Sequence, residues 1–142
     1  MTPQERKIED KVFGAKKNYQ MAINMPNLTS TGGSWVMRFA ELRQSPEKGD
    51  LTAPIVIMKV DPAYPPDLIR AHVEGTVVLY AVIRADGSVS QVRVLRGLEE
   101  RLDENARLAL AKWRFRPGTK NGSAVDLEAV VQVPFISTPV QF

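Results

Sequence analysis

The chain has 142 residues and a formal net charge of +3, with both signs interspersed and no cysteine. These values are ordinary for one globular domain, or for a small domain with an extension, and they exclude disulfides and thiolate metal sites. A weakly basic chain with mixed charges lacks the footprint of a nucleic-acid-binding protein, and no stretch approaches the roughly eighteen consecutive apolar residues of a membrane span.

The N-terminal part of the chain is predicted to be an extension that carries a β-hairpin. Residues 1–17 are polar and charged, and we expect the first several to be frayed. Apolar residues alternate with others on both sides of a segment that holds Pro26 and the pair Gly32-Gly33, which predicts a hairpin within residues 19–42. Residues 43–50 are typical of a linker. The apolar stripe of the hairpin consists of Tyr19, Met21, Ile23, Trp35, Met37 and Phe39.

A second hairpin, in residues 75–97, is predicted to be the centre of the domain. Two β-branched runs flank Asp86-Gly87, which is a strong signal for a tight hairpin turn. Both faces of the first run are apolar, with Val77, Leu79, Ala81 and Ile83 on one side and Val78, Tyr80 and Val82 on the other. Such a strand is expected to be central and covered on both sides, whereas the plainer second run belongs nearer an edge. We predict that the Val78 face meets the apolar stripe of the first hairpin or a second copy of the chain.

Two short helices and a final strand complete the predicted elements. Pro66 suits a helix start and Gly75 a stop, so residues 66–74 are predicted to be helical. Apolar residues at helical spacing predict a second helix over residues 102–113, with Asp103 as a candidate N-cap. Residues 125–135 alternate after the turn signal Asn121-Gly122 and predict a half-buried strand.

The handedness of crossover connections then gives the strand order. If the second helix connects the second hairpin strand to the last strand, the last strand must lie on the far side of the first. The prediction is an α+β fold with a three-stranded antiparallel sheet in the order second, first, last. Two helices cover one face, and the N-terminal hairpin lies on or near the other. Residues 1–53 form the extension and residues 54–142 the domain, and the last strand lies at an open edge.

Other groups of polar residues have simpler structural explanations than chemistry. His72, the only histidine, has no nucleophile or carboxylate arrangement around it that predicts a triad. Glu99, Glu100, Asp103 and Glu104 stand where they compensate a helix dipole. The run 112–116 alternates basic and aromatic residues, and its aromatic residues are expected in the core. The sequence therefore predicts no catalytic residue, no metal site, no cofactor and no enzymatic activity.

Several motifs, in order, resemble one known family. DPAYP, VEGTVVLYAVIRADGSVSQVRVL, LDENARLALAKWRFRPG and NG follow one another at family-like distances from Lys59 to about Ile136. Together they resemble the C-terminal domain of TonB, the energy transducer of Gram-negative envelopes. The resemblance implies a periplasmic domain, anchored to the inner membrane in the full-length protein and driven by an ExbB and ExbD type motor.

The resemblance also implies a partner and a binding edge. Domains of this family bind the TonB box, a short segment of outer-membrane transporters, by adding it as a strand to their sheet. Carried over to this sequence, the binding edge is Val130, Val131, Gln132 and Val133, with the loop residues Asp61, Pro62, Tyr64 and Pro65 beside it. A five-residue strand gains about 0.5 to 1.5 kcal/mol per hydrogen bond, against about 4 kcal/mol or more for association. Binding of this kind is expected to be weak and reversible.

The sequence departs from the family in three places. Asp61 stands where the best-known members have glutamine, the residues before Pro54 match nothing in the family's core domain, and the family's membrane helix and proline-rich spacer are not present. The chain is therefore either an excised part of a transducer or another use of the fold. The alternatives are a periplasmic scaffold or oligomerisation module of TolA-like architecture, including a homodimer, and a hydrolase, against which the lack of a nucleophile and base pair argues.

Overall fold

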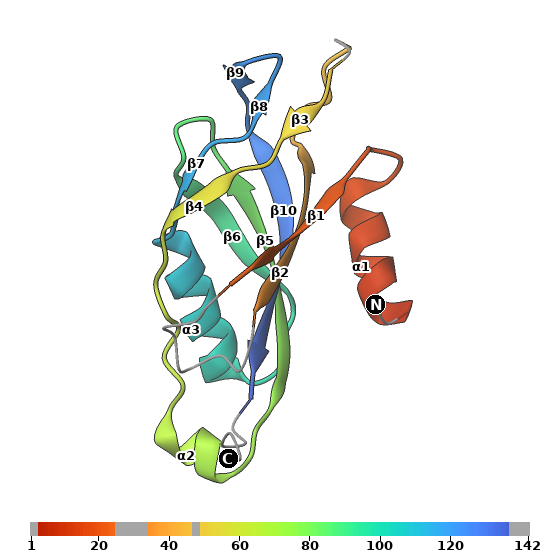
Figure 1. Cartoon of the computed structure of the whole chain (residues 1–142). Coiled ribbons are helices and arrows are strands. Elements are labelled where there is room, and N and C mark those ends of the chain that lie inside the picture. Colours follow the sequence, from red (N-terminus) through yellow and green to blue (C-terminus); the bar gives the residue numbers. More distant parts are fainter. Residues whose placement is uncertain (1–2, 25–33, 47–48, 137–142) are drawn as a thin grey trace.

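The computed structural model describes residues 3–24, 34–46 and 49–136 (Figure 1). The described helices are α1 (Pro3–Phe13), α2 (Pro66–Arg70) and α3 (Glu100–Ala111). The strands are β1 (Tyr19–Ile23), β2 (Trp35–Glu41), β3 (Leu51–Thr52), β4 (Ile55–Met58), β5 (Gly75–Ile83), β6 (Val89–Arg96), β7 (Arg114–Arg116), β8 (Thr119–Lys120), β9 (Ser123–Ala124) and β10 (Leu127–Phe135). None of the described helices is long and apolar enough to cross a bilayer.

An antiparallel five-stranded sheet in the order β1-β2-β10-β5-β6 forms the centre of the molecule. It contains the predicted order, because β5 lies between β6 and β10. The predicted number of strands is wrong, since β1 and β2 of the N-terminal hairpin continue the same sheet beyond β10. The hairpin strands pair from Tyr19 with Phe39 to Ile23 with Trp35, and the turn predicted at residues 26–34 lies largely outside the described residues. The α+β class is confirmed.

One face of the sheet carries the main hydrophobic core. Val77, Leu79, Ala81 and Ile83 of β5 point into it, as their alternation predicts. The apolar stripe of the first hairpin points into the same core instead of covering the opposite face of β5, so that prediction is wrong. The reason is geometric, because strands paired edge to edge in one sheet present their alternating residues to common faces. Helices α2 and α3 contribute Leu68, Leu102, Ala106 and Leu110 to this core (Figure 1).

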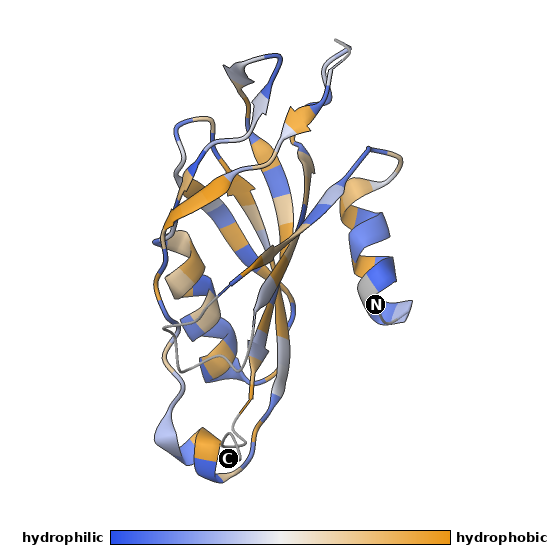
Figure 2. Cartoon of the chain, viewed as in Figure 1, coloured by the Kyte–Doolittle hydropathy of each residue, from blue (hydrophilic) through white to orange (hydrophobic). Residues whose placement is uncertain are grey.

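The opposite face is covered by α1, a helix that the sequence analysis did not predict. Phe13 is buried there with Ala40, Val78 and Val130, and Ile8 and Val12 pack against them. In Figure 2, apolar and polar residues alternate around α1, and the apolar ones are few. The strand β5 is therefore covered on both faces as predicted, but by α1 and not by the hairpin.

Two turns confirm their sequence signals. Gly87 has φ +88°, and a Cβ at this position would lie 2.0 Å from the carbonyl oxygen of Phe115, so a side chain there meets backbone. Asn121 and Gly122 both have positive φ, 52° and 82°, in the turn between β8 and β9, as a type I′ turn requires.

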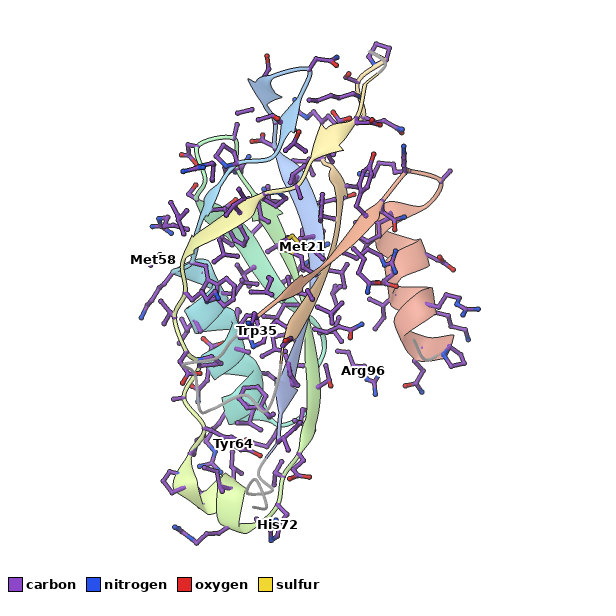
Figure 3. All side chains as sticks on the ribbon, viewed as in Figure 1. Met21, Trp35, Met58, Tyr64, His72 and Arg96 are labelled. Carbon is purple, nitrogen blue, oxygen red and sulfur yellow. The ribbon has the colours of Figure 1, made fainter. Side chains whose placement is uncertain are left out.

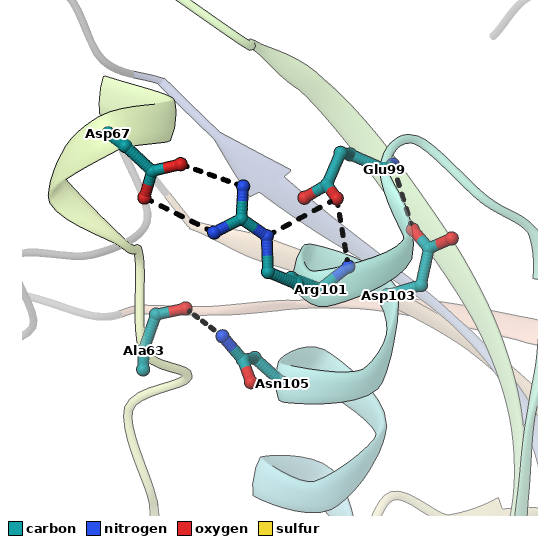
Figure 4. Close-up of polar contacts among 6 residues, drawn as sticks. All are labelled: Ala63, Asp67, Glu99, Arg101, Asp103 and Asn105. Carbon is teal, nitrogen blue, oxygen red and sulfur yellow. Dashed lines mark hydrogen bonds and ion pairs between the residues drawn. The ribbon is translucent and has the colours of Figure 1, made fainter. Parts of the chain in front are cut away.

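The helix boundaries differ slightly from prediction. Helix α2 ends at Arg70, and α3 begins at Glu100 with Glu99 as N-cap, whose side chain accepts a hydrogen bond from the amide of Arg101. Asp103, the predicted cap, instead accepts from the amide of Leu98 at 2.7 Å. Figure 4 shows how α2 is joined to α3, with Arg101 donating to both carboxylate oxygens of Asp67.

Candidate partner-binding edge

Strand β10, the predicted open edge, is paired on both sides. Along one side its residues Leu127–Phe135 pair with Ile83 through Gly75 of β5. Along the other, Leu127 to Gln132 pair with Glu41 through Val36 of β2. The prediction that the backbone of Val130, Val131 and Gln132 faces an unoccupied edge is therefore wrong. Hairpin and domain share one sheet, so the segment predicted as an appended extension supplies the neighbouring strand.

The contact between β2 and the core is extensive. Trp35 and Met37 are fully buried, and Phe39 is nearly so. The ring of Trp35 stacks on Trp113 with centroids 4.5 Å apart and planes 18° apart. Fully burying each such side chain stabilises by about 1.5 to 3 kcal/mol. Removing β2 from β10 would expose all three side chains. The free-energy cost of that exposure is larger than the net free energy gained by adding a short strand.

Polar groups hold the other face of the same strands. Arg38 of β2 donates to Glu9 of α1 at 2.9 Å and to the side chains of Asn18 and Gln20. Beside it, Glu128 of β10 forms an ion pair with Lys16 and accepts a hydrogen bond from the hydroxyl of Tyr80 at 2.9 Å. Charged pairs that are largely buried are costly to break, because the remaining partner keeps its desolvation penalty.

This network raises the pKa of the Tyr80 phenol. Burial, followed by the hydrogen bond to the Glu128 carboxylate, raises the pKa of Tyr80 to about 12. The neutral phenol is favoured in the fold, since its proton is the one donated to the carboxylate. The same ring faces the guanidinium of Arg93 at 4.3 Å from its centroid.

The predicted loop residues lie at the far end of β10 and are mostly buried. The ring of Tyr64 meets that of Phe135 edge to face at 5.2 Å, and its hydroxyl donates to the carbonyl of Val73 at 2.5 Å. Pro62 is buried, and Asp61 and Pro65 are half-buried. The structure thus places Tyr64 beside Phe135, at the end of β10. Tyr64, labelled in Figure 3, fixes the loop to the sheet.

Residues Val133, Pro134 and Phe135 lie beyond the last pair that β10 makes with β2. They pair with Val77, Thr76 and Gly75 of β5 on one side. In the part of the chain that the structure describes, no strand pairs with their other side. Three residues form too short a ladder to hold a strand alone.

The rim of the sheet on this side is formed by β1. It pairs with β2 along one side, and no other described strand pairs with it. Tyr19 and Met21 are half-buried at this rim and pack against the core, while Gln20 and Ala22 are exposed. At the end of β1 the amine of Lys59 donates to the carbonyl of Asn24. The main-chain groups available for a further strand are therefore on β1.

The opposite rim of the sheet is less suited to an added strand. Strand β6 pairs with β5 through a ladder with two register shifts, and Gln91 has a positive φ of 53°. Bulges and arginine side chains, such as Arg93 and Arg96, are typical devices that protect an edge from pairing. We therefore regard β1 as the better candidate edge.

The remaining polar candidates have structural roles. Glu99 and Asp103 accept backbone hydrogen bonds at the start of α3. Trp113 and Phe115 are buried in the core, as predicted, with exposed arginines beside them. His72 is exposed just after α2. Within residues 3–24, 34–46 and 49–136, no cluster of histidine and carboxylate side chains has the arrangement to hold a metal ion.

Helix α1, which covers the second face of β2, β5 and β10, was not predicted from the sequence. The available signal was the spacing of Ile8, Val12 and Phe13, of which Phe13 is buried. That signal is weak, because the surrounding residues are almost all charged. Two of these charged residues, Glu9 and Lys16, form ion pairs with Arg38 and Glu128.

These features define a small α+β domain whose accessible chemistry is the backbone at its sheet rims. Residues 60–136 match the family model of the Gram-negative bacterial TonB protein C-terminal domain. The chain therefore belongs to the TonB C-terminal domain family, and the resemblance found in the sequence is confirmed. The predicted boundary between residues 53 and 54 stays a prediction, although the matched region begins close to it.

Relatives and a solved structure agree with this assignment. Protein TonB of Xanthomonas campestris pv. campestris (strain B100) is 39% identical over 75 residues, which cover 52% of this chain and 34% of that protein. Protein TonB of Pseudomonas aeruginosa PAO1 is 34% identical over 74 residues, covering 51% of this chain and 22% of that protein. The chain thus matches about a third or less of these relatives.

The fold is also similar to a known one. The solution NMR structure of the Pseudomonas aeruginosa TonB C-terminal domain superposes with a TM-score of 0.51 and 25% sequence identity. The superposition covers 72% of this chain and 98% of that chain.

Proposed function

We propose that this chain is the partner-binding domain of a TonB-like energy transducer. In this proposal it lies in the periplasm and binds the TonB box of outer-membrane transporters by β-strand addition, without catalysis. A membrane-anchored part of the full-length protein, driven by an ExbB and ExbD type motor, would supply the work. Family membership supports this role.

The observation that carries the proposal is the rim strand β1. A TonB box is an extended segment, and an extended segment binds where a strand has unpaired main-chain groups. Strand β1 is the terminal strand of the five-stranded sheet. Within β1, the half-buried Tyr19 and Met21 offer apolar contacts to the side chains of an added strand.

The family's expected edge, Val130 to Val133, is the competing position. Its use requires β2 to leave β10, which would expose Trp35, Met37 and Phe39. The cost of that exposure is about 1.5 to 3 kcal/mol for each side chain. Addition to β1 requires no such release, so we place the partner there, with Asp61, Pro62, Tyr64 and Pro65 as supports of the sheet.

The test is a titration of isotopically labelled domain with a TonB-box peptide, followed by NMR. We expect amide shifts at Tyr19–Ile23, with saturation at about millimolar peptide. A peptide with the same side chains and N-methylated alternate amides should not bind, because it lacks half of the donors. Absence of shifts, or equal binding by the methylated peptide, would overturn strand addition.

A cross-strand disulfide decides between the two edges. Val36 and Gln132 are direct partners on β2 and β10, and both are half-buried. Such pairs have Cα separations within the range that a disulfide accepts. Because the chain has no cysteine, the variant Val36→Cys with Gln132→Cys has one possible bridge. We expect the oxidised variant to bind as well as the reduced one. Loss of binding on oxidation would overturn the β1 position and return the partner to β10.

A further inference from the structure

A separate two-stranded ribbon, β4 with β7, has a composition unusual for a solvent-facing surface. Ile55, Ile57 and Met58 of β4 are 54%, 63% and 46% exposed, respectively. Figure 2 shows β4 as one of the most apolar segments of the chain, and Figure 3 shows Met58 at the periphery of the molecule. Contiguous exposed apolar side chains on a strand are characteristic of interaction sites.

The two faces of this ribbon differ. Ile55 pairs with Arg116 and Val56 pairs with Phe115. Val56 and Phe115 pack into the core, which leaves Ile55 on the outer face with Arg116. The ladder shifts register between Val56 and Met58, so Ile57 and Met58 are both exposed, and Met58 pairs with Arg114. The outer face thus combines an apolar row with a row of guanidinium groups.

The edge of β4 is also available. Strand β7 lies between β4 and the turn at residues 87–88, where the amide of Phe115 donates to Gly87 and Arg114 bridges Ser88. Strand β4 pairs with β7 along one side only, among the strands that the structure describes. Its ladder has one register shift, against two in that of β6, and β4 itself contains no charged residue, so its other side can receive an extended chain.

Charge restricts the occupant. The cations around β4 are Lys59, Lys112, Arg114 and Arg116, all exposed, and neither strand of the ribbon contains a carboxylate. Asp86, whose carboxylate also feels the charge of Arg114, already accepts hydrogen bonds from the amide and hydroxyl of Ser88, and these lower its pKa. An approaching segment with carboxylates would complement this surface, and a basic one would be repelled.

A second copy of this chain fits poorly. Pairing β4 with β4 across a twofold axis would place two rows of arginines about three strand spacings, or about 14 Å, apart, with no carboxylate from either ribbon to pair with them. A stable dimer also buries roughly 1,200 Å² or more, which a strand of four residues does not supply, whereas a weakly and transiently bound segment buries less. The occupant is therefore a segment of a different protein.

We propose that the β4–β7 ribbon is a docking site for an extended acidic segment of a partner protein, added as a strand along β4. Its β-branched residues would lie beside Ile55 and Ile57. Carboxylates at its two ends would reach Arg114 and Arg116 across about two strand spacings, or about 10 Å, a distance that glutamate and arginine side chains together span. The site is independent of the TonB-box site proposed on β1.

The probe is the peptide Glu-Thr-Val-Thr-Val-Thr-Glu. As a strand it presents its two glutamates and two valines on one face and its three threonines on the other. Titrated against the labelled full chain, it should shift the amides of β4 and β7. Its affinity should fall as salt is raised. The peptide with lysine in place of glutamate should bind at least about tenfold more weakly.

Variants on exposed positions locate the site without disturbing the fold. Ile57→Asp, and Arg114→Glu combined with Arg116→Glu, should each weaken binding by about tenfold or more. The matched controls are Val94→Asp and Arg96→Glu on the other exposed edge strand, β6, and they should bind as wild type does. Circular dichroism of each variant checks that it is folded.

Three results of the titrations would overturn the proposal. They are no shifts at millimolar peptide, shifts located on β1 or β6, and wild-type binding by Ile57→Asp. A concentration-dependent dimer that Ile57→Asp abolishes would also overturn it, since the occupant would then be a second copy. The TonB-box peptide should shift the amides of Tyr19–Ile23, whereas the acidic peptide should shift those of β4 and β7. Each proposal can therefore fail without the other.

Discussion

The two faces of the central sheet are built by different means. The face towards α3 is an apolar core that includes both tryptophans, Trp35 and Trp113, stacked on each other. The face towards α1 has a small apolar cluster around Phe13 and is completed by the charged groups Arg38, Glu9, Lys16 and Glu128. Strands β2, β5 and β10 contribute to both faces.

This difference separates two kinds of stabilisation within one strand. Removal of area from water is additive and insensitive to pH, whereas a buried ion pair stabilises only while both partners are present. The apolar face should therefore hold β2 against β10. The charged face should determine where α1 lies on the sheet. Each of the following changes tests one side of the comparison.

The largest effect is expected for Trp35→Ala. The ring is fully buried against Trp113, so its removal leaves a cavity in the core and should cost about 3 to 5 kcal/mol of unfolding free energy. Urea unfolding followed by circular dichroism measures this loss. Val94→Ala on the exposed edge strand is the control, and equal losses for the two variants would contradict the assignment of the core.

A smaller loss is expected when one partner of the charged face is removed. Arg38→Ala leaves the carboxylate of Glu9, which is 7% exposed, without its guanidinium. Because the Arg38 side chain is 24% exposed and the pair is only partly buried, the loss should be about 1 to 3 kcal/mol. The double variant Glu9→Gln with Arg38→Ala removes both charges and should be more stable than Arg38→Ala alone. Urea unfolding of the four proteins in the cycle measures the coupling, and a double variant no better than Arg38→Ala would argue against a buried pair.

The phenol of Tyr80 makes the charged face sensitive to alkaline pH. Its pKa is about 12 in the fold and about 10 in the unfolded chain. Since the folded pKa is the higher one, the contribution is complete below about pH 10 and is lost as pH rises towards about 12. The stability difference between wild type and Tyr80→Phe should shrink by about 1 to 2 kcal/mol over that window. A constant difference across these pH values would show that the phenol is not perturbed.

The smallest effect is expected at the exposed ion pair of Asp67 with Arg101 (Figure 4). Arg101 lowers the pKa of Asp67 through its hydrogen bonds, but both side chains are more than half exposed. Solvent and salt screen such pairs, so Asp67→Ala should leave the urea midpoint unchanged within error. A clear drop would mean that α2 depends on this pair and not on the buried Leu68.

Local patterns in the sequence determined most of the elements. The alternation in β5, the Asp86-Gly87 turn, the Asn121-Gly122 turn and the helical spacing in α3 each act over a few residues, and each was interpreted correctly. The order β6-β5-β10 followed from the handedness of a single crossover. The family resemblance required only the order of such local motifs.

What the sequence did not decide was which surfaces meet across long distances in the chain. The stripe of β1 and β2 needs an apolar partner, but alternation alone does not distinguish stacking on the sheet from continuation of the sheet beyond β10. In the structure the hairpin continues the sheet, because β2 then pairs its backbone with β10 and also buries Trp35 against Trp113. That same choice moved the free rim from β10 to β1, and it left the opposite face to α1, whose few apolar residues become significant only beside Val78 and Val130.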